Sequence, residues 1–239
     1  MLRISKINAI KKEFDQLANK KQVEVLQRFF KTGKDQYGYG DVFLGIKVPE
    51  QRKLAKSFFD LELSEIQQLL NSKIHEQRLT ALFILIGQYK KSDEKNKQKI
   101  FNLYLKNTKK INNWDLVDLS APNIVGNFLL DKPRKVLYQL ARSKNLWEKR
   151  IAILSTYTFI RQNDFGDTLK ISELLLIDSH DLIHKAVGWM LREVGKRDLK
   201  IEEQFLKKYY QKMPRTMLRY AIEKFPENKR QRYLLGKIV

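Results

Sequence analysis

Apolar residues recur at the spacing of one helix face along almost the whole chain. Segments such as RLTALFILIGQYKK, EKRIAILSTYTFIRQ and KAVGWMLREV place them at i, i+3, i+4 and i+7, the pattern of an amphipathic helix. No short run alternates apolar and polar side chains as a half-buried strand would. The prolines near predicted first turns of helices, where proline is tolerated, are Pro49, Pro133, Pro214 and Pro226. The sequence therefore predicts an all-α fold.

A loose repeat with a period of about 35 residues relates the predicted helices. Aligning EQRLTALFIL with EKRIAILSTY places Arg78 and Arg150 in register, two periods apart, with Trp114 halfway between them and Lys185 one period further on. Two helices per period without a tetratricopeptide signature are typical of a HEAT-like solenoid. We therefore expect residues 1–239 to form a single domain, a curved α-solenoid of about six HEAT-like helical pairs with a concave groove.

The charge balance indicates what that groove would bind. The chain has 47 Lys and Arg against 27 Asp and Glu, a net charge of +20, although 43% hydrophobic residues mark it as folded. A folded basic domain usually meets a polyanion, because each neutralised phosphate releases counterions. A solubilising surface is the alternative. The absence of cysteine excludes disulfides, thiolate zinc sites and cysteine nucleophiles.

The chain has no segment that predicts membrane insertion. No apolar run approaches the roughly 18 residues of a membrane span. The N-terminal MLRISKINAIKKEF is basic and amphipathic, but it contains Glu13, is followed by Asp15, and lacks the apolar core of a signal peptide. We interpret it as the first helix of the fold, and expect a cytoplasmic protein. Nothing in the sequence indicates an oligomer interface, so a monomer is expected.

Two local patterns resemble known sites without completing them. KTGKDQYGYGDVFLGIKVP contains four of the ten glycines but no Gly-Lys-Ser/Thr, so it predicts an ordered loop between the second and third helices and not a P-loop. HDLIH places His180 and His184 one helical turn apart, but the preceding Asp178 and Ser179 indicate a helix start. We therefore expect no metal and no cofactor.

The segment INNWDLVDLSAP contains a carboxylate, Asp118, that has no local partner and that we expect to be unpaired. Asp118 follows Trp114 by one helical turn, and no lysine or arginine lies at a helical spacing from Asp118. Trp189 and Arg192 repeat the pattern at i and i+3, and Arg150 occupies the matching point of the intervening repeat. The alternative is structural, with tryptophans in the core between repeats and Arg150 paired to a neighbouring helix.

A carboxylate among aromatic rings in a basic groove suggests the stabilisation of a cation. When an N-glycosidic bond breaks, the sugar becomes oxocarbenium-like, and a nearby carboxylate favours that state. Indole faces also attract cations. An alkylated purine that already carries a positive charge leaves without protonation, so this reaction needs no general acid, metal or cofactor.

These same residues carry a resemblance to a known family. NNWDLVDLSAP, NLWEKRIAIL, HKAVGWMLREVGKRD and MPRTMLRYAIEKFPE, with DVFLGIKVPEQRKLA upstream, resemble the AlkD-type DNA alkylation repair proteins from about residue 20 to 230. These are bacterial alkylpurine DNA glycosylases built from HEAT-like repeats. The resemblance implies action on cationic N3- and N7-alkylpurines in duplex DNA without flipping the base into a pocket, and without the lysine chemistry of bifunctional lyases.

The resemblance also implies roles for individual residues. It makes Asp118 the catalytic aspartate, with Trp114 and Trp189 as the aromatic walls. It assigns Arg150 and Arg192 to the DNA backbone, and the repeat adds Lys185 to the same groove. The family's type member has a tyrosine on the second helix, where this chain has Phe29 and Phe30, and its turn is shorter than the 33–45 loop.

The sequence therefore predicts a monofunctional alkylpurine DNA glycosylase. The first alternative is a non-catalytic relative that binds distorted or branched DNA through backbone contacts. The second is an α-solenoid scaffold or an RNA-binding protein.

Overall fold

The computed structural model describes residues 6–238, and these residues are helical with no β-strand. The all-α prediction is confirmed. The chain divides into two compact units, Met1–Leu116 and Val117–Val239. The single-domain solenoid over 1–239 and its concave groove stay predictions. The predicted N-terminal helix begins at Lys6, and residues 1–5 of that prediction lie outside the described residues.

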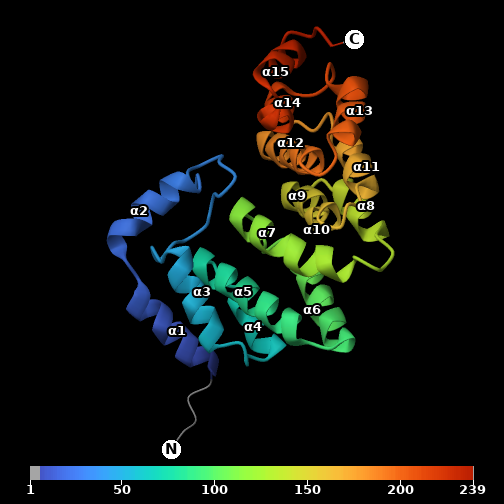
Figure 1. Ribbon diagram of the computed structural model, residues 1–239. Helices are drawn as coiled ribbons and strands as arrows, with labels where there is room; N and C mark the ends of the chain where they lie inside the picture. Colours follow the sequence, from blue (N-terminus) through green and yellow to red (C-terminus); the bar gives the residue numbers. More distant parts are fainter. Residues whose placement is uncertain (1–5, 239) are drawn as a thin grey trace, which may run out of the picture. The chain divides into compact units, whose positions relative to one another are not determined.

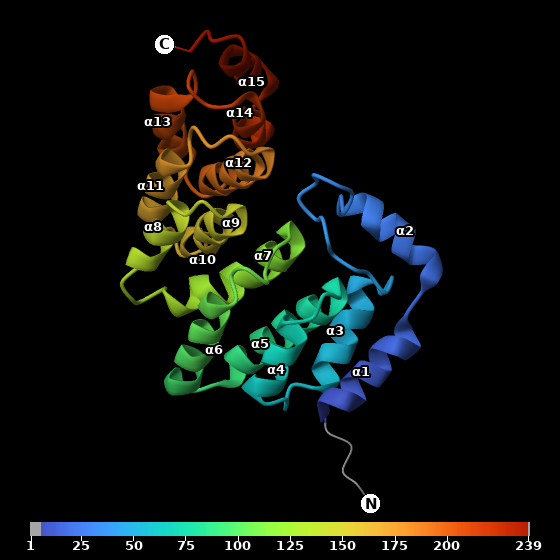
Figure 2. The ribbon, with the colours of Figure 1, turned by 180° about the vertical axis from the view of Figure 1, so that it is seen from behind.

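The first unit is built around one buried helix. Its helices are α1 (Lys6–Leu17), α2 (Lys20–Phe29), α3 (Val48–Ser57), α4 (Leu63–Leu70), α5 (His75–Lys91) and α6 (Glu94–Lys106), followed by the start of α7 (Trp114–Ala121). Helices α3 and α4 both pack along α5 (Figures 1 and 2). Helix α5 buries residues on all sides, whereas α2 has no buried residue. Helix α5 is therefore the core of the unit, and α2 remains at its surface.

The glycine-rich segment between α2 and α3 is an ordered loop, as predicted. Its end is held by the buried Glu76 of α5, whose carboxylate accepts hydrogen bonds from the backbone N–H groups of Leu44, Gly45 and Ile46 at 2.9–3.2 Å. Val42 forms an isolated parallel β-bridge with Ile74, the residue that precedes α5. The loop is thereby fixed against the N-terminal end of the central helix.

The second unit continues from α7 through a series of mostly short helices. They are η1 (Pro122–Gly126), α8 (Lys135–Ala141), α9 (Leu146–Ser155), α10 (Tyr157–Ile160), α11 (Gly166–Leu174), α12 (Asp181–Gly195), α13 (Leu199–Tyr209), α14 (Arg215–Ala221), η2 (Ile222–Lys224) and α15 (Glu227–Leu234). Helix α8 packs on α9, and α12 packs on α9, α13 and α14. The apolar stripe of α12, which includes Ile183, Val187 and Val194, is fully buried because those residues share one helix face.

No helix among residues 6–238 combines the length and the hydrophobicity that crossing a bilayer requires.

Candidate functional site

Helix α7 carries two of the predicted site residues, Trp114 and Asp118, one turn apart. The helix begins at Trp114 because side chains satisfy its first backbone N–H groups. Asn113 Oδ1 accepts from the Trp114 N–H, and Asp115 Oδ1 accepts from the Leu116 N–H, both at 2.8 Å. The division between the two units falls within this helix, after Leu116. Trp114 therefore belongs to the first unit and Asp118 to the second.

Trp114 packs against the end of α2. Its ring stacks on Phe30 with a centroid distance of 5.4 Å and an interplanar angle of 24°. The ring of Phe29 packs edge-on against Trp114 with a centroid distance of 5.7 Å. Phe30 is 7% exposed and Phe29 is 59% exposed. Phe29 and Phe30 were both predicted from the sequence to contact DNA. Only Phe29 is accessible, whereas Phe30 is buried against Trp114.

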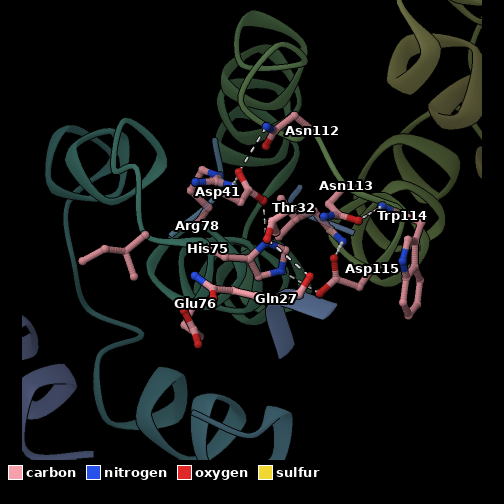
Figure 3. Close-up of polar contacts among 12 residues, drawn as sticks. Gln27, Thr32, Asp41, His75, Glu76, Arg78, Asn112, Asn113, Trp114 and Asp115 are labelled. Atoms are coloured by element: carbon pink, nitrogen blue, oxygen red, sulfur yellow. Dashed lines mark hydrogen bonds and ion pairs between the residues drawn. The ribbon is translucent and has the colours of Figure 1, made fainter. Parts of the chain in front are cut away.

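A buried polar layer around His75 lies beside Trp114 (Figure 3). His75 Nδ1 lies 2.9 Å from Asp41 Oδ2, and His75 Nε2 lies 2.9 Å from Asp115 Oδ2. Arg78 donates to the other oxygen of Asp41 at 2.7 Å. All four residues are at most 8% exposed. Sequence reasoning missed this cluster, because its members come from the loop, from α5 and from α7, which have no common local pattern.

The layer shifts the protonation of its own members. Burial alone would lower the pKa of His75, but the charges and hydrogen bonds of Asp115 and Asp41 outweigh it and raise the pKa to about 9. Burial would likewise raise the pKa of Asp41, and the hydrogen bond from His75 with the charge of Arg78 lowers it instead. His75 is therefore an imidazolium at neutral pH that donates to two carboxylates.

The second unit provides a partner for Asp118. Arg150 Nε donates to Asp118 Oδ1 and Arg150 Nη2 donates to Asp118 Oδ2, both at 2.7 Å. Arg150 Nη1 also donates to the Leu182 carbonyl at 2.5 Å. The expectation that Asp118 is unpaired is therefore wrong. Its partner lies on α9, where spacing along one helix cannot reveal it, and the alternative in which Arg150 pairs with a neighbouring helix is the observed one.

The ion pair is only slightly accessible. The Asp118 side chain is 14% exposed and the Arg150 side chain is 6% exposed. Both Asp118 oxygens accept from one planar guanidinium, a bidentate geometry that fixes the plane of the carboxylate as well as its position. Arg150 thereby links α7, α9 and α12.

Helix α12 carries the other predicted residues of this unit. Trp189 is half-buried, and its ring centroid lies 6.3 Å from that of Tyr157. Its Nε1–H donates a hydrogen bond to Glu193 Oε1 at 3.1 Å. Arg192 pairs with Glu223, and Lys185 pairs with Asp181. The two predicted DNA-binding side chains thus already have acidic partners, and phosphate would have to displace those partners to be bound.

The two histidines of HDLIH have structural contacts. His180 is the N-cap of α12 and its Nδ1 accepts from the Leu182 N–H at 3.1 Å. His184 Nε2 lies 2.5 Å from the Asp178 carbonyl oxygen. The predicted helix start is confirmed. Among residues 6–238, no group of three or more His, Asp or Glu side chains is arranged to hold a metal ion.

Comparison with known proteins agrees with this fold. The chain is similar to a predicted DNA alkylation repair enzyme from Enterococcus faecalis, with 16% identity and a TM-score of 0.68 over 88% of this chain and 97% of that one. It is also similar to AlkD2 from Streptococcus mutans, with 17% identity and a TM-score of 0.55 over 86% and 98% of the two chains. At such identities the likeness concerns the fold. No curated protein matches the sequence.

The match to a family model decides the family. The model described as DNA alkylation repair enzyme matches residues 10–225, nearly the whole chain. Together with the two similar structures, it confirms the resemblance to AlkD-type proteins. The chain therefore belongs to the DNA alkylation repair enzyme family.

Proposed function

We propose that this DNA repair enzyme is a monofunctional glycosylase for cationic N3- and N7-alkylated purines in duplex DNA. The observation that carries the proposal is the Asp118 carboxylate, which two hydrogen bonds from Arg150 hold in a fixed orientation at a slightly accessible position. A carboxylate that is positioned before the reaction stabilises a developing positive charge without reorganisation.

The reaction requires only what such a carboxylate provides. The bond between C1′ and the purine nitrogen breaks, and its electron pair moves to the base, which neutralises the positive charge of the alkylated ring. The sugar becomes oxocarbenium-like and is stabilised by Asp118. Water then adds to C1′ and releases a proton to solvent. Because a carboxylate has about four lone-pair sites, it can accept from Arg150 and orient this water at once.

Aromatic side chains would hold the damaged nucleotide. Trp114 and Trp189 are both half-buried, so part of each indole can meet a ligand. An alkylated purine with a positive charge is attracted to an indole face. Phe29, exposed beside Trp114, adds an apolar surface on which a base can stack. Recognition by charge and stacking, with the base left outside any enclosed pocket, is part of the proposal.

The basic residues would bind the DNA backbone. A net charge of +20 favours a long polyanion, and we assign phosphate contacts to Arg192 and Lys185. Arg150 is already committed to Asp118 and Leu182, so we assign it the positioning of the carboxylate in addition to the predicted DNA contact. A cytoplasmic monomer that uses no metal or cofactor completes the proposal.

One observation favours a second function. The pairing of Asp118 with Arg150 is also what a structural ion pair between helices would look like. If that is its only role, the protein is a non-catalytic relative that binds distorted or branched DNA through its basic surface.

The test is release of free base from duplex DNA that contains 3-methyladenine or 7-methylguanine. We expect release by the wild type and a loss of at least about a hundredfold in Asp118→Asn, assayed at a temperature at which circular dichroism shows that the variant is folded. Asp131→Asn is the matched control, because Asp131 is exposed in the same unit, and it should keep full activity. Release at the wild-type rate by Asp118→Asn would contradict the proposed role of Asp118. A folded wild type that releases no base but prefers four-way junctions over linear duplex would support the second function.

A further inference from the structure

The buried layer around His75 is not used by the proposed chemistry. The side chains of His75, Asp41, Asp115 and Arg78 are 2–6% exposed. Removing four ionisable groups from water is costly, and a well-packed apolar cluster of the same volume is often at least as stable. A layer of this kind therefore needs a reason beyond stability, and its geometry suggests one.

His75 connects two segments that are distant in the sequence. One ring nitrogen faces Asp41, which lies in the loop between α2 and α3, and the other faces Asp115 in the first turn of α7. The second oxygen of Asp115 accepts from the Leu116 N–H, which fixes that turn. Arg78 holds Asp41 from the other side at 2.7 Å. The imidazolium is therefore the link between the loop and the start of α7.

A second connection runs through the rings. His75 stacks on Phe43 with centroids 4.6 Å apart and lies 4.9 Å from Phe30. Phe30 in turn stacks on Trp114 at 5.4 Å. Trp114 is thus connected to His75 by two indirect routes, through the backbone beside Asp115 and through the ring of Phe30. Figure 3 shows His75 between Asp41 and Asp115, with Trp114 next to them.

We propose that His75 is a positioning residue for Trp114, and that its two hydrogen bonds to Asp41 and Asp115 hold the indole in the place where it meets the damaged base. The catalytic meaning of this position rests on the proposed glycosylase function, whereas the position itself does not. His75 touches neither substrate nor reacting atoms, and it acts only through Trp114.

Both hydrogen bonds require the charged ring. A neutral imidazole has only one N–H, so on deprotonation one of the two carboxylates loses its hydrogen bond from His75, and both negative charges stay buried without the imidazolium between them. The charged groups in contact with His75 are Asp41 from the loop and Asp115 from α7, and Arg78 of α5 contacts Asp41. The neighbouring Glu76 is directed instead to backbone N–H groups of the loop. None of these replaces the lost proton.

The sign of the pH dependence follows from the raised pKa. In an unfolded chain the pKa of histidine is about 6.5, and in the folded protein His75 has a pKa of about 9. The stabilisation that the layer contributes to folding is therefore complete below pH 6.5, and it is lost as the pH rises through about 9, where His75 of the folded protein loses its proton. If His75 positions Trp114, the environment of the indole must change over the same range.

The first test follows the indole directly. The protein is labelled with 5-fluorotryptophan, and the three fluorine resonances are assigned with Trp→Phe variants. In the wild type, the Trp114 resonance should shift between pH 7 and 10 with a midpoint near 9, whereas Trp147, in the other unit, should not respond. His75→Gln should move the Trp114 resonance at pH 7 and remove its titration. A Trp114 resonance independent of pH in the wild type would overturn the proposal.

The second test separates positioning from mere stability. At pH 7 and 25 °C, with circular dichroism used to check that both proteins are folded, His75→Gln should lower the single-turnover rate of base release by about tenfold or more, with unchanged affinity for undamaged duplex. His184→Gln, the same change in the second unit, should be silent. Equal rates for His75→Gln and wild type would also overturn the proposal. If the wild type releases no base, the glycosylase function fails, and the fluorine experiment still decides whether His75 positions Trp114.

Discussion

A single guanidinium determines the geometry around Asp118. Arg150 uses Nε and Nη2 for the two carboxylate oxygens and Nη1 for the carbonyl of Leu182. Only arginine offers donors in this planar arrangement, since the lysine ammonium is a point charge on a flexible chain. The position of the carboxylate therefore depends on the shape of its partner as well as on its charge.

Arg150→Lys tests that dependence. The variant keeps the positive charge beside Asp118 but loses the two parallel hydrogen bonds, so base release should fall by about tenfold to a hundredfold. Arg150→Met leaves the carboxylate without its cation and should lower the free energy of unfolding by about 3 kcal/mol. Urea unfolding and single-turnover assays measure the two effects. A fully active Arg150→Lys would show that the bidentate geometry is dispensable.

Glu202 is a second buried group whose protonation affects stability. The side chain is 1% exposed. Burial, followed by the nearby charge of Glu203, raises the pKa of Glu202 to about 9, and Arg192 lowers it only in part. The folded protein therefore holds a proton that the unfolded chain releases near pH 4.5. Because the native state binds more protons between these values, stability falls as the pH rises from about 4.5 to 9.

Glu202→Gln should remove this loss. The amide resembles the protonated acid and does not titrate, so the free energy of unfolding at pH 7 should rise by about 1–3 kcal/mol. The decrease in the free energy of unfolding between pH 5 and pH 9, measured by urea unfolding, should become smaller than in the wild type. Glu173→Gln, which changes an exposed glutamate of the same unit, serves as the control. An unchanged slope in Glu202→Gln would mean that Glu202 is ionised in the folded protein.

The loop between α2 and α3 shows how an element without regular structure becomes rigid. Gly45 has a φ of +82°, and a Cβ atom there would lie 2.1 Å from the Asn19 carbonyl oxygen. Gly40 has a similar φ of +87°, but nothing lies within 4 Å of its Cβ position. The two glycines therefore share the backbone conformation and differ in their surroundings.

This pair separates conformational strain from close packing. Gly40→Ala should cost only the strain of a positive φ, about 1–2 kcal/mol. Gly45→Ala adds a collision with the backbone and weakens the N–H contacts to Glu76. The melting temperature of Gly45→Ala should therefore be clearly lower than that of Gly40→Ala. Thermal unfolding of the two variants gives the comparison. Equal losses would show that the loop can move away from Asn19.

Periodicity predicted the elements well but not the contacts between them. The helices around RLTALFILIG and KAVGWMLREV follow directly from the spacing of their apolar residues, and His180 begins its helix as expected. The expectation that Asp118 is unpaired was wrong because its partner Arg150 lies on another helix, where the spacing of residues along one helix does not reveal it. The Asp41–His75–Asp115 layer was missed for the same physical reason, since hydrogen bonds between segments leave no local spacing. Phe29 and Phe30 are adjacent, and only packing distinguishes them.

At the scale of the whole molecule, charge is the dominant property. The net charge of +20 is spread along the chain, so DNA binding should depend steeply on salt. Each phosphate that is neutralised adds a slope of about −0.9 to log Kobs against log salt. Removing Lys185 or Arg192 by substitution with alanine should therefore reduce the magnitude of the slope by about one unit each.

Titrations of duplex DNA at several salt concentrations measure this slope. Lys91→Ala, in the other unit, controls for the general loss of one charge. If all three variants reduce the slope equally, Lys185 and Arg192 have no special place in the interface, and binding depends on total charge alone.

The pairing of Asp118 with Arg150 also has a consequence for evolution. A nearly buried guanidinium that loses its carboxylate remains as an uncompensated cation, and a carboxylate that loses its guanidinium is also destabilising. Neither position can change alone without destabilising the protein. In descendants that abandon the reaction, residues 118 and 150 should therefore be replaced together, and the joint loss would record the change of function in the sequence.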